Sequence, residues 1–343
     1  MKGKKICIMA ISLCMVLPYL CGCQSGQDKK TTRMHIGVAC YNQSDTFISE
    51  MVGCFKEELY AGSGDETEVT VTCMDAAGSQ RTQNDQVKEL ISAGCSVLCV
   101  NLVDRTDPSE IIDLARDNDV PLIFFNREPV AEDMKQWDKI YYIGADAKQS
   151  GIMQGEVAAE AIKADKNLDR NKDGKIQYVV LEGEPGHQDA IIRTENAVNT
   201  LQKNGIELEK LGGGIANWNR AQSQNRMIQM IGQYQNQIEL VLANNDDMAL
   251  GAIDAYKKLN YTESAYPVFF GIDGTSVGLE AIKDGSLAGT VYNDKEGQAL
   301  AMAKLAKALV LKTGLEGLTF EKENCIYLPY SKVTLENVDE YLP

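Results

Sequence analysis

The sequence is short of basic residues, and this shortage excludes one class of protein. Lysine and arginine number 34 against 49 aspartate and glutamate residues, so the formal charge of the 343-residue chain is -15. A nucleic-acid-binding protein needs a basic surface to neutralise phosphate groups. We therefore expect no nucleic-acid partner, and a small neutral ligand suits this composition better.

The motifs of common enzymes are also missing. The chain contains no GxSxG, HExxH or Walker A motif, and no GxGxxG follows a predicted strand. Only two histidines are present. His187 and Asp189 could belong to a catalytic set, but no nucleophile motif accompanies them. Hydrolysis and phosphate or dinucleotide chemistry thus lack their usual residues, and we expect a binding protein and not an enzyme.

Cysteine pairs with metal-ligand spacing are absent as well. None of the ten cysteines forms a CxxC pair, and Cys95 and Cys99 have no histidine nearby, which argues against a zinc site. Cys40, Cys73 and Cys99 each lie within an apolar, strand-like run. We therefore expect buried free thiols at these positions and not disulfides.

The N-terminus has a basic start followed by an apolar run. Lys2, Lys4 and Lys5 precede residues 6–21, which are almost continuously apolar. This run is shorter than the roughly 17–25 residues of a transmembrane helix. We predict a cleaved export signal over residues 1–22.

Residues 20–23 (LCGC) resemble the lipobox of bacterial lipoproteins. The resemblance implies that Cys23 is lipidated and begins a polar tether over residues 23–33; cleavage nearby to give a soluble secreted protein is the alternative. Loss of residues 1–22 removes three lysines and no acidic residue, so the basic residues fall from 34 to 31 against 49 and the charge becomes about -18. We expect a lipid anchor on the extracytoplasmic face of the cell membrane, on the periplasmic or cell-surface side.

From residue 34 onward, short apolar runs alternate with longer runs of helical period, which is typical of an α/β fold with parallel sheets. The chain is longer than one hydrophobic core usually supports, so we predict two doubly wound parallel-sheet lobes. Strands of the first sheet are expected at residues 36–40, 69–74, 96–100 and 121–125, and strands of the second at 176–181, 206–211, 239–243, 267–271 and 287–291. Helices are expected at residues 47–61, 82–93, 109–117, 147–164, 189–204, 220–234, 247–259 and 276–284.

A further helix at residues 297–311 and a last strand at 325–328 follow the second series. We predict an N-terminal lobe of residues 34–144 plus 294–328 and a C-terminal lobe of residues 145–293 plus 329–343, joined by a three-segment hinge. Two such lobes leave a cleft between the carboxyl ends of their strands, where α/β folds place ligands.

Residues 169–177 (DRNKDGKIQ) resemble the loop of an EF-hand. Asp169, Asn171, Asp173 and Gln177 occupy positions 1, 3, 5 and 9, glycine occupies position 6, and the carbonyl of Lys175 would serve at position 7. The glutamate of position 12 is replaced by Val180, so a further carboxylate must come from elsewhere. We expect a structural calcium ion here; a metal-free turn rich in Asp and Asn is the alternative.

Polar and aromatic side chains gather where the predicted strands end. Sugar hydroxyl groups both donate and accept hydrogen bonds, so a sugar site combines Asp, Asn, Arg and His with flat aromatic rings. The residues that offer this combination are Asp45, Phe47, Asn126, His187, Asp189, Arg193, Trp218, Asn245, Asp273 and Asn293.

These residues lie in segments that resemble those of the bacterial galactose/glucose-binding proteins over about residues 34–330. The segments are SDTF (44–47), QNDQ (83–86), NLVD (101–104), PLIFFNREP (121–129), the calcium-like loop, LEGEPGHQDA (181–190), ANNDDMALGA (243–252) and LAGTVYND (287–294). The resemblance implies a periplasmic binding protein type I fold. It implies that Phe47 and Trp218 sandwich a pyranose ring, that the other eight residues hydrogen-bond its hydroxyls, and that Glu239 completes the calcium site.

The function implied is that of an extracytoplasmic binding subunit of an ABC sugar importer. Such a monomer would capture D-galactose or D-glucose by hinge closure and deliver it to permease and ATPase subunits. Two alternatives stay open: a sugar sensor that presents its hexose to a chemoreceptor or sensor kinase, and a glycosidase, which would need paired carboxylates at a scissile bond.

Overall fold

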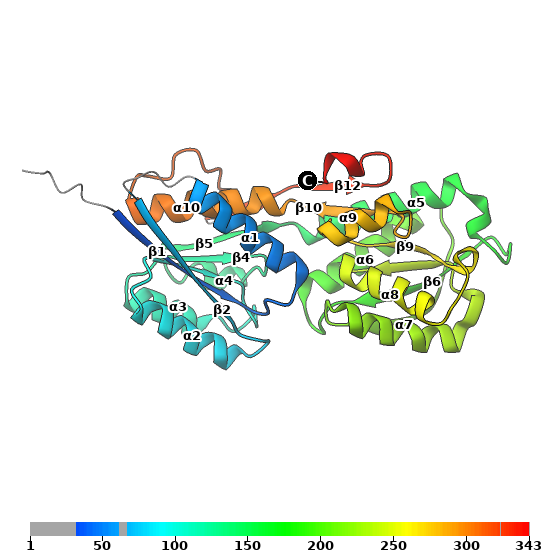
Figure 1. Cartoon of the computed structure of the whole chain (residues 1–343), viewed down its shortest axis with the longest axis horizontal. Coiled ribbons are helices and arrows are strands. Elements are labelled where there is room, and N and C mark those ends of the chain that lie inside the picture. Colours follow the sequence, from blue (N-terminus) through cyan, green and yellow to red (C-terminus); the bar gives the residue numbers. More distant parts are fainter. Residues whose placement is uncertain (1–31, 62–66, 323, 343) are drawn as a thin grey trace, which may run out of the picture.

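The computed structural model describes residues 32–61, 67–322 and 324–342. The predicted export signal, the predicted lipidation of Cys23 and most of the predicted tether lie outside the described residues. Two α/β lobes lie side by side along the long axis of the molecule (Figure 1).

The first lobe is built on a six-stranded sheet whose pairs are all parallel. Its strand order is β11-β5-β4-β3-β1-β2. The strands are β1 (Thr32–Cys40), β2 (Thr67–Asp75), β3 (Val97–Val100), β4 (Leu122–Phe125), β5 (Ile140–Ala145) and β11 (Cys325–Leu328). Every residue of β3 and β4 is buried, because helices cover both faces of the sheet and the strands read as continuous apolar runs.

Helices α1 (Thr46–Ala61) and α10 (Lys295–Leu311) pack on one face of this sheet, around a core that includes Phe55 and Met302. Helices α2 (Gln80–Ser92) and α3 (Ser109–Asp117) pack on the other, around Leu90 and Ile112. The short helix α4 (Ala131–Met134) precedes β5.

The second lobe is built on a four-stranded parallel sheet of order β7-β6-β8-β9. The strands are β6 (Ile176–Glu182), β7 (Leu208–Ile215), β8 (Leu240–Ala243) and β9 (Val268–Phe270), and the helices are α5 (Ala147–Ala164), α6 (Gln188–Lys203), α7 (Arg220–Tyr234), α8 (Asp246–Lys258) and α9 (Ser276–Lys283). Alternate residues of β6 face opposite cores: Val180 contacts the core under α5 and α6, and Val179 the core under α7 and α8.

The prediction that residues 287–291 form a fifth parallel strand of the second sheet is met only in part, because the strand begins later and is not among the four strands of that sheet. The strand here is β10 (Thr290–Asn293), which pairs antiparallel with β12 (Tyr330–Val333), a strand that the sequence pattern did not reveal. The segment still runs parallel beside the end of β9, through the bridges Phe270 to Gly289 and Asp273 to Tyr292 and through backbone hydrogen bonds such as that from the N–H of Asp273 to the carbonyl of Val291 at 2.8 Å. The pairing joins residues about forty positions apart, so local periodicity carries no signal for it.

Three chain crossings link the lobes, between β5 and α5, between β10 and α10, and between β11 and β12. No helix within the described part of the chain is long and apolar enough to span a membrane. None of the described cysteines forms a disulfide, as predicted. Cys40 and Cys99 are buried, in agreement with the prediction, whereas Cys73 is only partly buried.

Candidate functional site

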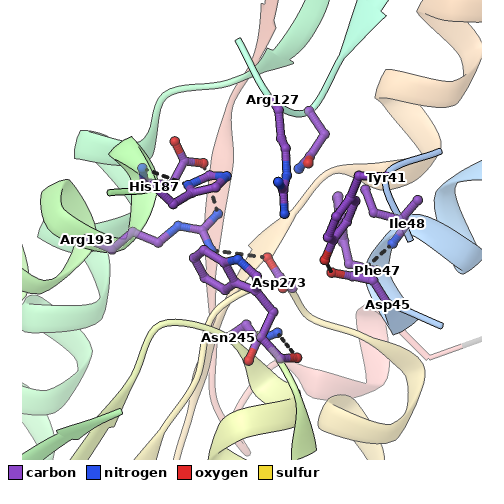
Figure 2. A pocket seen from close by; sticks show the side chains of 12 residues that line it. Tyr41, Asp45, Phe47, Ile48, Arg127, His187, Arg193, Asn245 and Asp273 are labelled. Carbon is purple, nitrogen blue, oxygen red and sulfur yellow. Dashed lines mark hydrogen bonds and ion pairs between the residues drawn. The ribbon is translucent and has the colours of Figure 1, made fainter. Parts of the chain in front are cut away.

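A pocket with about 350 Å³ of free space, part of it open to solvent, lies where the carboxyl ends of the two sheets face each other (Figure 2). Nine of the ten predicted ligand contacts line it: Asp45, Phe47, Asn126, His187, Asp189, Arg193, Trp218, Asn245 and Asp273. Tyr41, Ile48 and Arg127 complete the lining and were not predicted. Tyr41 directly follows the first predicted strand and Arg127 directly follows Asn126, so their places at strand ends could have identified them.

The exception is Asn293, which is buried beside the pocket but does not line it. Its backbone N–H donates to the carbonyl of Asp273 at 3.0 Å, and its side-chain oxygen accepts a hydrogen bond from Gln298 at 2.7 Å. Asn293 thus holds the backbone of Asp273 in place and does not itself face the pocket.

Three of the pocket residues have an unusual backbone conformation, with a positive φ. Asn126 and Trp218 both have φ of 60°, and Asp273 has φ of 115°, all in the region that favours glycine. Such strain persists only where the surroundings enforce it, and it concentrates at functional sites. A Cβ added to Gly183 would lie 2.1 Å from Cζ2 of Trp218, so glycine at that position lets the indole lie against the end of β6.

The first-lobe wall of the pocket centres on Asp45. Its Oδ2 accepts from the hydroxyl of Tyr41 at 2.5 Å and its Oδ1 accepts from the N–H of Ile48 at 3.0 Å. Burial, and then the charge of Asp45, raise the pKa of Tyr41, so the phenol remains a donor. The guanidinium of Arg127 lies 3.6 Å from the centre of the Tyr41 ring, which stacks a cation on the aromatic face.

The second-lobe wall centres on Arg193, which is 4% exposed. Its guanidinium donates to the carbonyl of Asn244 at 2.8 Å and to the hydroxyl of Tyr330 at 3.1 Å. It also lies 3.6 Å from Asp273 and 3.9 Å from Asp189. Burial acts to lower the pKa of Arg193, but Tyr330 and the two carboxyl groups outweigh burial and the net direction is upward, so the cation is retained.

Burial raises the pKa of both Asp189 and Asp273, while Arg193 opposes the rise. One cation is thus shared between two carboxyl groups. The Nε of Arg193 is buried and has no hydrogen-bond partner among the described residues. An unmet buried donor costs free energy, so it is suited to a ligand acceptor.

His187 is a neutral donor. Its Nδ1 accepts from the N–H of Asp189 at 3.2 Å, which leaves the proton on Nε2. Burial first, and then the positive charges of Arg127, Arg193 and Arg105, lower the pKa of His187 to about 2. The imidazole meets the ring of Trp218 edge-on, with centroids 5.1 Å apart.

Three contacts close the lobes on one another around this pocket. Arg127 pairs with Glu184 of the second lobe at 3.1 Å. Thr46 donates its hydroxyl proton to Asp247 across the cleft at 2.7 Å. Ser276 donates its N–H to Glu50 at 3.0 Å. The structure therefore shows a closed arrangement of the lobes.

The calcium-like loop lies at the far end of the second lobe from this pocket, before β6. The N–H groups of Gly174, Asp173 and Lys175 donate to side-chain oxygens of the loop at 2.8–2.9 Å. Glu239, which is 2% exposed, accepts from the N–H of Arg170 at 2.6 Å and from the N–H of Gln177 at 3.0 Å. Glu239 is thus held against the loop.

The loop has two buried oxygens that could bind a cation. Asp169 Oδ1 and Gln177 Oε1 are buried without hydrogen-bond partners among the described residues, and oxygens in this state are suited to a hard cation. No group of three or more His, Cys, Asp or Glu side chains in the described ranges has a metal-ligating arrangement. The predicted set draws in part on amide and carbonyl oxygens, as calcium sites do.

The sequence matches one protein-family model and a known sugar-binding protein over most of its length. Residues 36–314 match the family model described as periplasmic binding protein domain. The chain is 37% identical over 310 residues to the D-galactose/methyl-galactoside binding periplasmic protein MglB of Haemophilus influenzae, a match that covers 90% of this chain and 91% of that protein.

Two solved structures are similar in fold. An ABC transporter solute binding protein from Bacillus halodurans C-125 with bound myo-inositol is 30% identical, with a TM-score of 0.73, and the match covers 91% of this chain and 98% of that one. A periplasmic solute binding protein from Actinobacillus succinogenes 130z with bound D-allose has a TM-score of 0.75 over 90% of this chain and 100% of that one. Its identity is 19%, so this second likeness shows the fold alone.

Proposed function

The chain belongs to the periplasmic binding protein family, and from that premise we propose that it is the extracytoplasmic D-galactose- or D-glucose-binding subunit of an ABC importer. The observation that carries the proposal is the composition of the pocket. Phe47 from one lobe and Trp218 from the other line a space otherwise bounded by Asp, Asn, Arg and His side chains. Rings cover the apolar faces of a pyranose, and the polar groups replace water around its hydroxyls.

The mechanism proposed is capture by hinge closure. The hexose binds one wall while the lobes are apart, and closure then forms the contacts from Thr46 to Asp247 and from Arg127 to Glu184. Permease subunits would recognise the closed shape, and no bond is broken. In the bound state His187 donates from Nε2, and Asp45, with both carboxylate oxygens already fixed by Tyr41 and Ile48, accepts.

Calorimetric titration of the purified chain with monosaccharides tests this function. D-galactose or D-glucose should bind at least about 100-fold more tightly than D-ribose, because a pentose leaves part of the polar lining without partners. Tight binding of ribose with no measurable hexose binding would refute the assignment. Turnover of an aryl glycoside would instead support an enzyme.

We also propose that residues 169–177 and Glu239 hold a structural calcium ion. Asp169, Asn171, Asp173 and Gln177 would supply side-chain oxygens, Lys175 its carbonyl, and Glu239 the carboxylate missing from position 12. The partnerless oxygens of Asp169 and Gln177 support this proposal. The ion would brace the start of β6 and supply no chemistry in the distant pocket.

Calcium-dependent melting tests the metal site. Added calcium should raise the Tm of the wild type, since an ion that binds only the folded state stabilises it. Asp173→Ala should abolish that rise. Asp165→Ala removes the same charge just before the loop, so it should keep the rise. A rise unchanged in Asp173→Ala would show that calcium binds somewhere other than this loop.

We further propose that Cys23 carries a lipid anchor that holds the protein at the outer face of the membrane. The support is the LCGC sequence at residues 20–23 and the polar tether that follows it. Cys23→Ala should release the protein from the membrane fraction, whereas Cys21→Ala should not. Release of both variants, or of neither, would contradict the assignment.

A further inference from the structure

Lys295 is a buried cation at a place that does not favour one. It is the first residue of α10, just after the crossing from β10, and it is 5% exposed. The start of a helix carries a partial positive charge, which repels a cation, and burial removes the water that would hydrate an ammonium group. Other groups must therefore stabilise Lys295.

Groups from both lobes contact the ammonium group of Lys295. Its Nζ lies 2.8 Å from Oε2 of Glu50, on α1 of the first lobe, and donates to the carbonyl of Gly274, in the second lobe, at 3.1 Å. The carboxylate of Glu296 is more distant, at 4.0 Å. Lys295 thus joins the first lobe to the segment that follows Asp273, a residue of the ligand pocket.

Glu50 contacts the same segment through its other carboxylate oxygen. Its Oε1 accepts from the N–H of Ser276 at 3.0 Å, and Ser276 is the first residue of α9. A carboxylate is favoured at this end of a helix, where the partial charge is positive. One ion pair of the first lobe therefore holds the backbone of the second lobe at both Gly274 and Ser276.

Closure of the lobes brings carboxyl groups together beside this ion pair. Burial raises the pKa of Asp247 in the second lobe, against a hydrogen bond from Thr46. The negative charges of Asp45 and Glu50, in the first lobe, add to the rise. Repulsion between carboxylates resists closure. Because Lys295 offsets the charge of Glu50, this cation favours the closed arrangement.

We propose that Lys295 and Glu50 are positioning residues that hold residues 273–276 in the closed arrangement and so set how slowly the bound sugar leaves. Neither residue lines the ligand pocket. They act through the backbone next to Asp273, which does line it. The inference rests on the proposed function, because it requires a sugar in the pocket.

Stopped-flow kinetics with the hexose that the wild type binds test the role of the cation. Lys295→Met removes the charge and keeps a long side chain, and Glu50, whose side chain is 21% exposed, can be hydrated. Release should become at least about 10-fold faster, while association stays within about 2-fold because the sugar meets open lobes. The control Lys283→Met removes a cation that pairs with Asp339 on the surface of the second lobe. It should change neither rate.

A proline at residue 276 tests the hydrogen bond to Glu50 with little effect on the fold. Proline lacks the N–H and is favoured at the first position of a helix. Thr275 has φ of -65° and ψ of 154°, an extended conformation that a following proline favours. Ser276→Pro should speed release at least about 3-fold, because one hydrogen bond between the lobes is lost. The control Ala131→Pro makes the same change at the first residue of α4, after an extended Val130, and should leave release unchanged.

The double variant shows whether the two contacts act together. If Lys295 acts by holding Glu50 against residue 276, Ser276→Pro should speed release less in the Lys295→Met background than in the wild type. Independent, additive effects on the logarithm of the release rate would overturn a joint role.

The outcomes separate this inference from the proposed function. Hexose binding with release at the wild-type rate in either single variant overturns the positioning role alone. A lower free energy of unfolding in Lys295→Met with unchanged release shows that Lys295 only stabilises the start of α10, which also overturns the role. If Lys295→Met does not fold, Ser276→Pro decides by itself. Absence of hexose binding in the wild type overturns the proposed function and this inference together.

Discussion

The two walls of the ligand pocket hold their charges in different ways. In the second lobe, Arg193 is paired within its own lobe, with Asp189, Asp273 and Tyr330. In the first lobe, Arg127 stacks on Tyr41, but its ion-pair partner, Glu184, belongs to the second lobe. The second wall can therefore stay assembled when the lobes part, whereas the first is completed by closure. We infer that the sugar binds the second lobe first.

Behind these charged residues, each lobe has a buried glutamine whose side-chain amide is bonded to backbone carbonyls at the ends of its strands. Gln83 of the first lobe is fully buried and donates to the carbonyl of Asn101 at 2.8 Å, at the end of β3. Gln154 of the second lobe, 1% exposed, donates to the carbonyl of Ala243 at 2.7 Å, at the end of β8. Each amide ties strand ends together, so the difference between the walls lies in the charges and not in the scaffold.

The largest expected effect comes from removing the cation of each wall. Arg193→Met leaves the buried carboxyl group of Asp273 and the 24% exposed one of Asp189 without their cation. It should lower the free energy of unfolding by about 3–5 kcal/mol, chiefly through Asp273, and abolish sugar binding. Arg127→Met should lower it by about 1 kcal/mol, because Glu184 is 32% exposed and can be hydrated. Urea unfolding measures both. Equal losses would contradict the asymmetry of the walls.

The two walls also contribute different aromatic rings to the pocket, Phe47 from the first lobe and Trp218 from the second. Trp218→Ala should raise the Kd for hexose about 100-fold, or ~2.8 kcal/mol, since the indole presents the larger ring face. Phe47→Leu keeps an apolar side chain in a residue that also belongs to the core of its lobe, and it should raise the Kd about 10-fold. Calorimetry on both variants, with circular dichroism as a check on folding, measures the difference. Wild-type affinity in Trp218→Ala would exclude stacking.

A buried carboxyl group follows a strand of the second lobe at a position where the first lobe has an apolar residue, and it gives a pH prediction. Asp246 is the third residue after β8, and the third residue after β3 is Val103. Asp246 is fully buried, and burial raises its pKa to about 7, although hydrogen bonds from Thr290 and Thr275 oppose the rise. Between about pH 4 and pH 7 the folded state then holds a proton that the unfolded state has released. Stability therefore falls as the pH rises through this window.

In the wild type, the free energy of unfolding should fall between about pH 4 and pH 7. Asp246→Asn should reduce this fall by an amount on the order of a few kcal/mol. The amide can still accept from the N–H of Thr275, as the carboxyl group does at 2.9 Å. Urea unfolding at pH 4.5 and pH 7.5 compares the variant with the wild type. If both lose the same stability between these pH values, the slope has another source.

The smallest effect is expected at a contact between the lobes. Thr46→Val removes the hydrogen bond to Asp247, which exists only when the lobes are closed, so it should weaken sugar binding about 5-fold, or ~1 kcal/mol, chiefly through faster release. In the control, Thr106→Val, the lost hydrogen bond of 2.7 Å joins Asp104 within a single loop. Stopped-flow release of the sugar should differ between the two variants. Equal release rates would argue that the contact plays no part in closure.

Much of the secondary structure follows from local pattern. The predicted bounds of α3, α5, α7 and β11 agree with the structure, because caps and periodic apolar residues within each segment encode its ends. β5 was missed although all of its residues except Ala145 are buried. A short apolar run without alternation does not distinguish a strand from part of a helix. β12 was missed because its partner, β10, is remote in the chain.

The local sequence also determines which side chains follow each strand. Parallel strands bring their carboxyl ends to one edge of the sheet, so nine of the predicted contacts line one pocket. Only the tertiary structure decided how these side chains are held. The bond from Arg193 to Tyr330 joins residues 137 positions apart, and the one from Arg127 to Glu184 joins residues 57 apart. Such pairs depend on how whole lobes pack and close, and that information is spread over the entire chain and absent from any local segment.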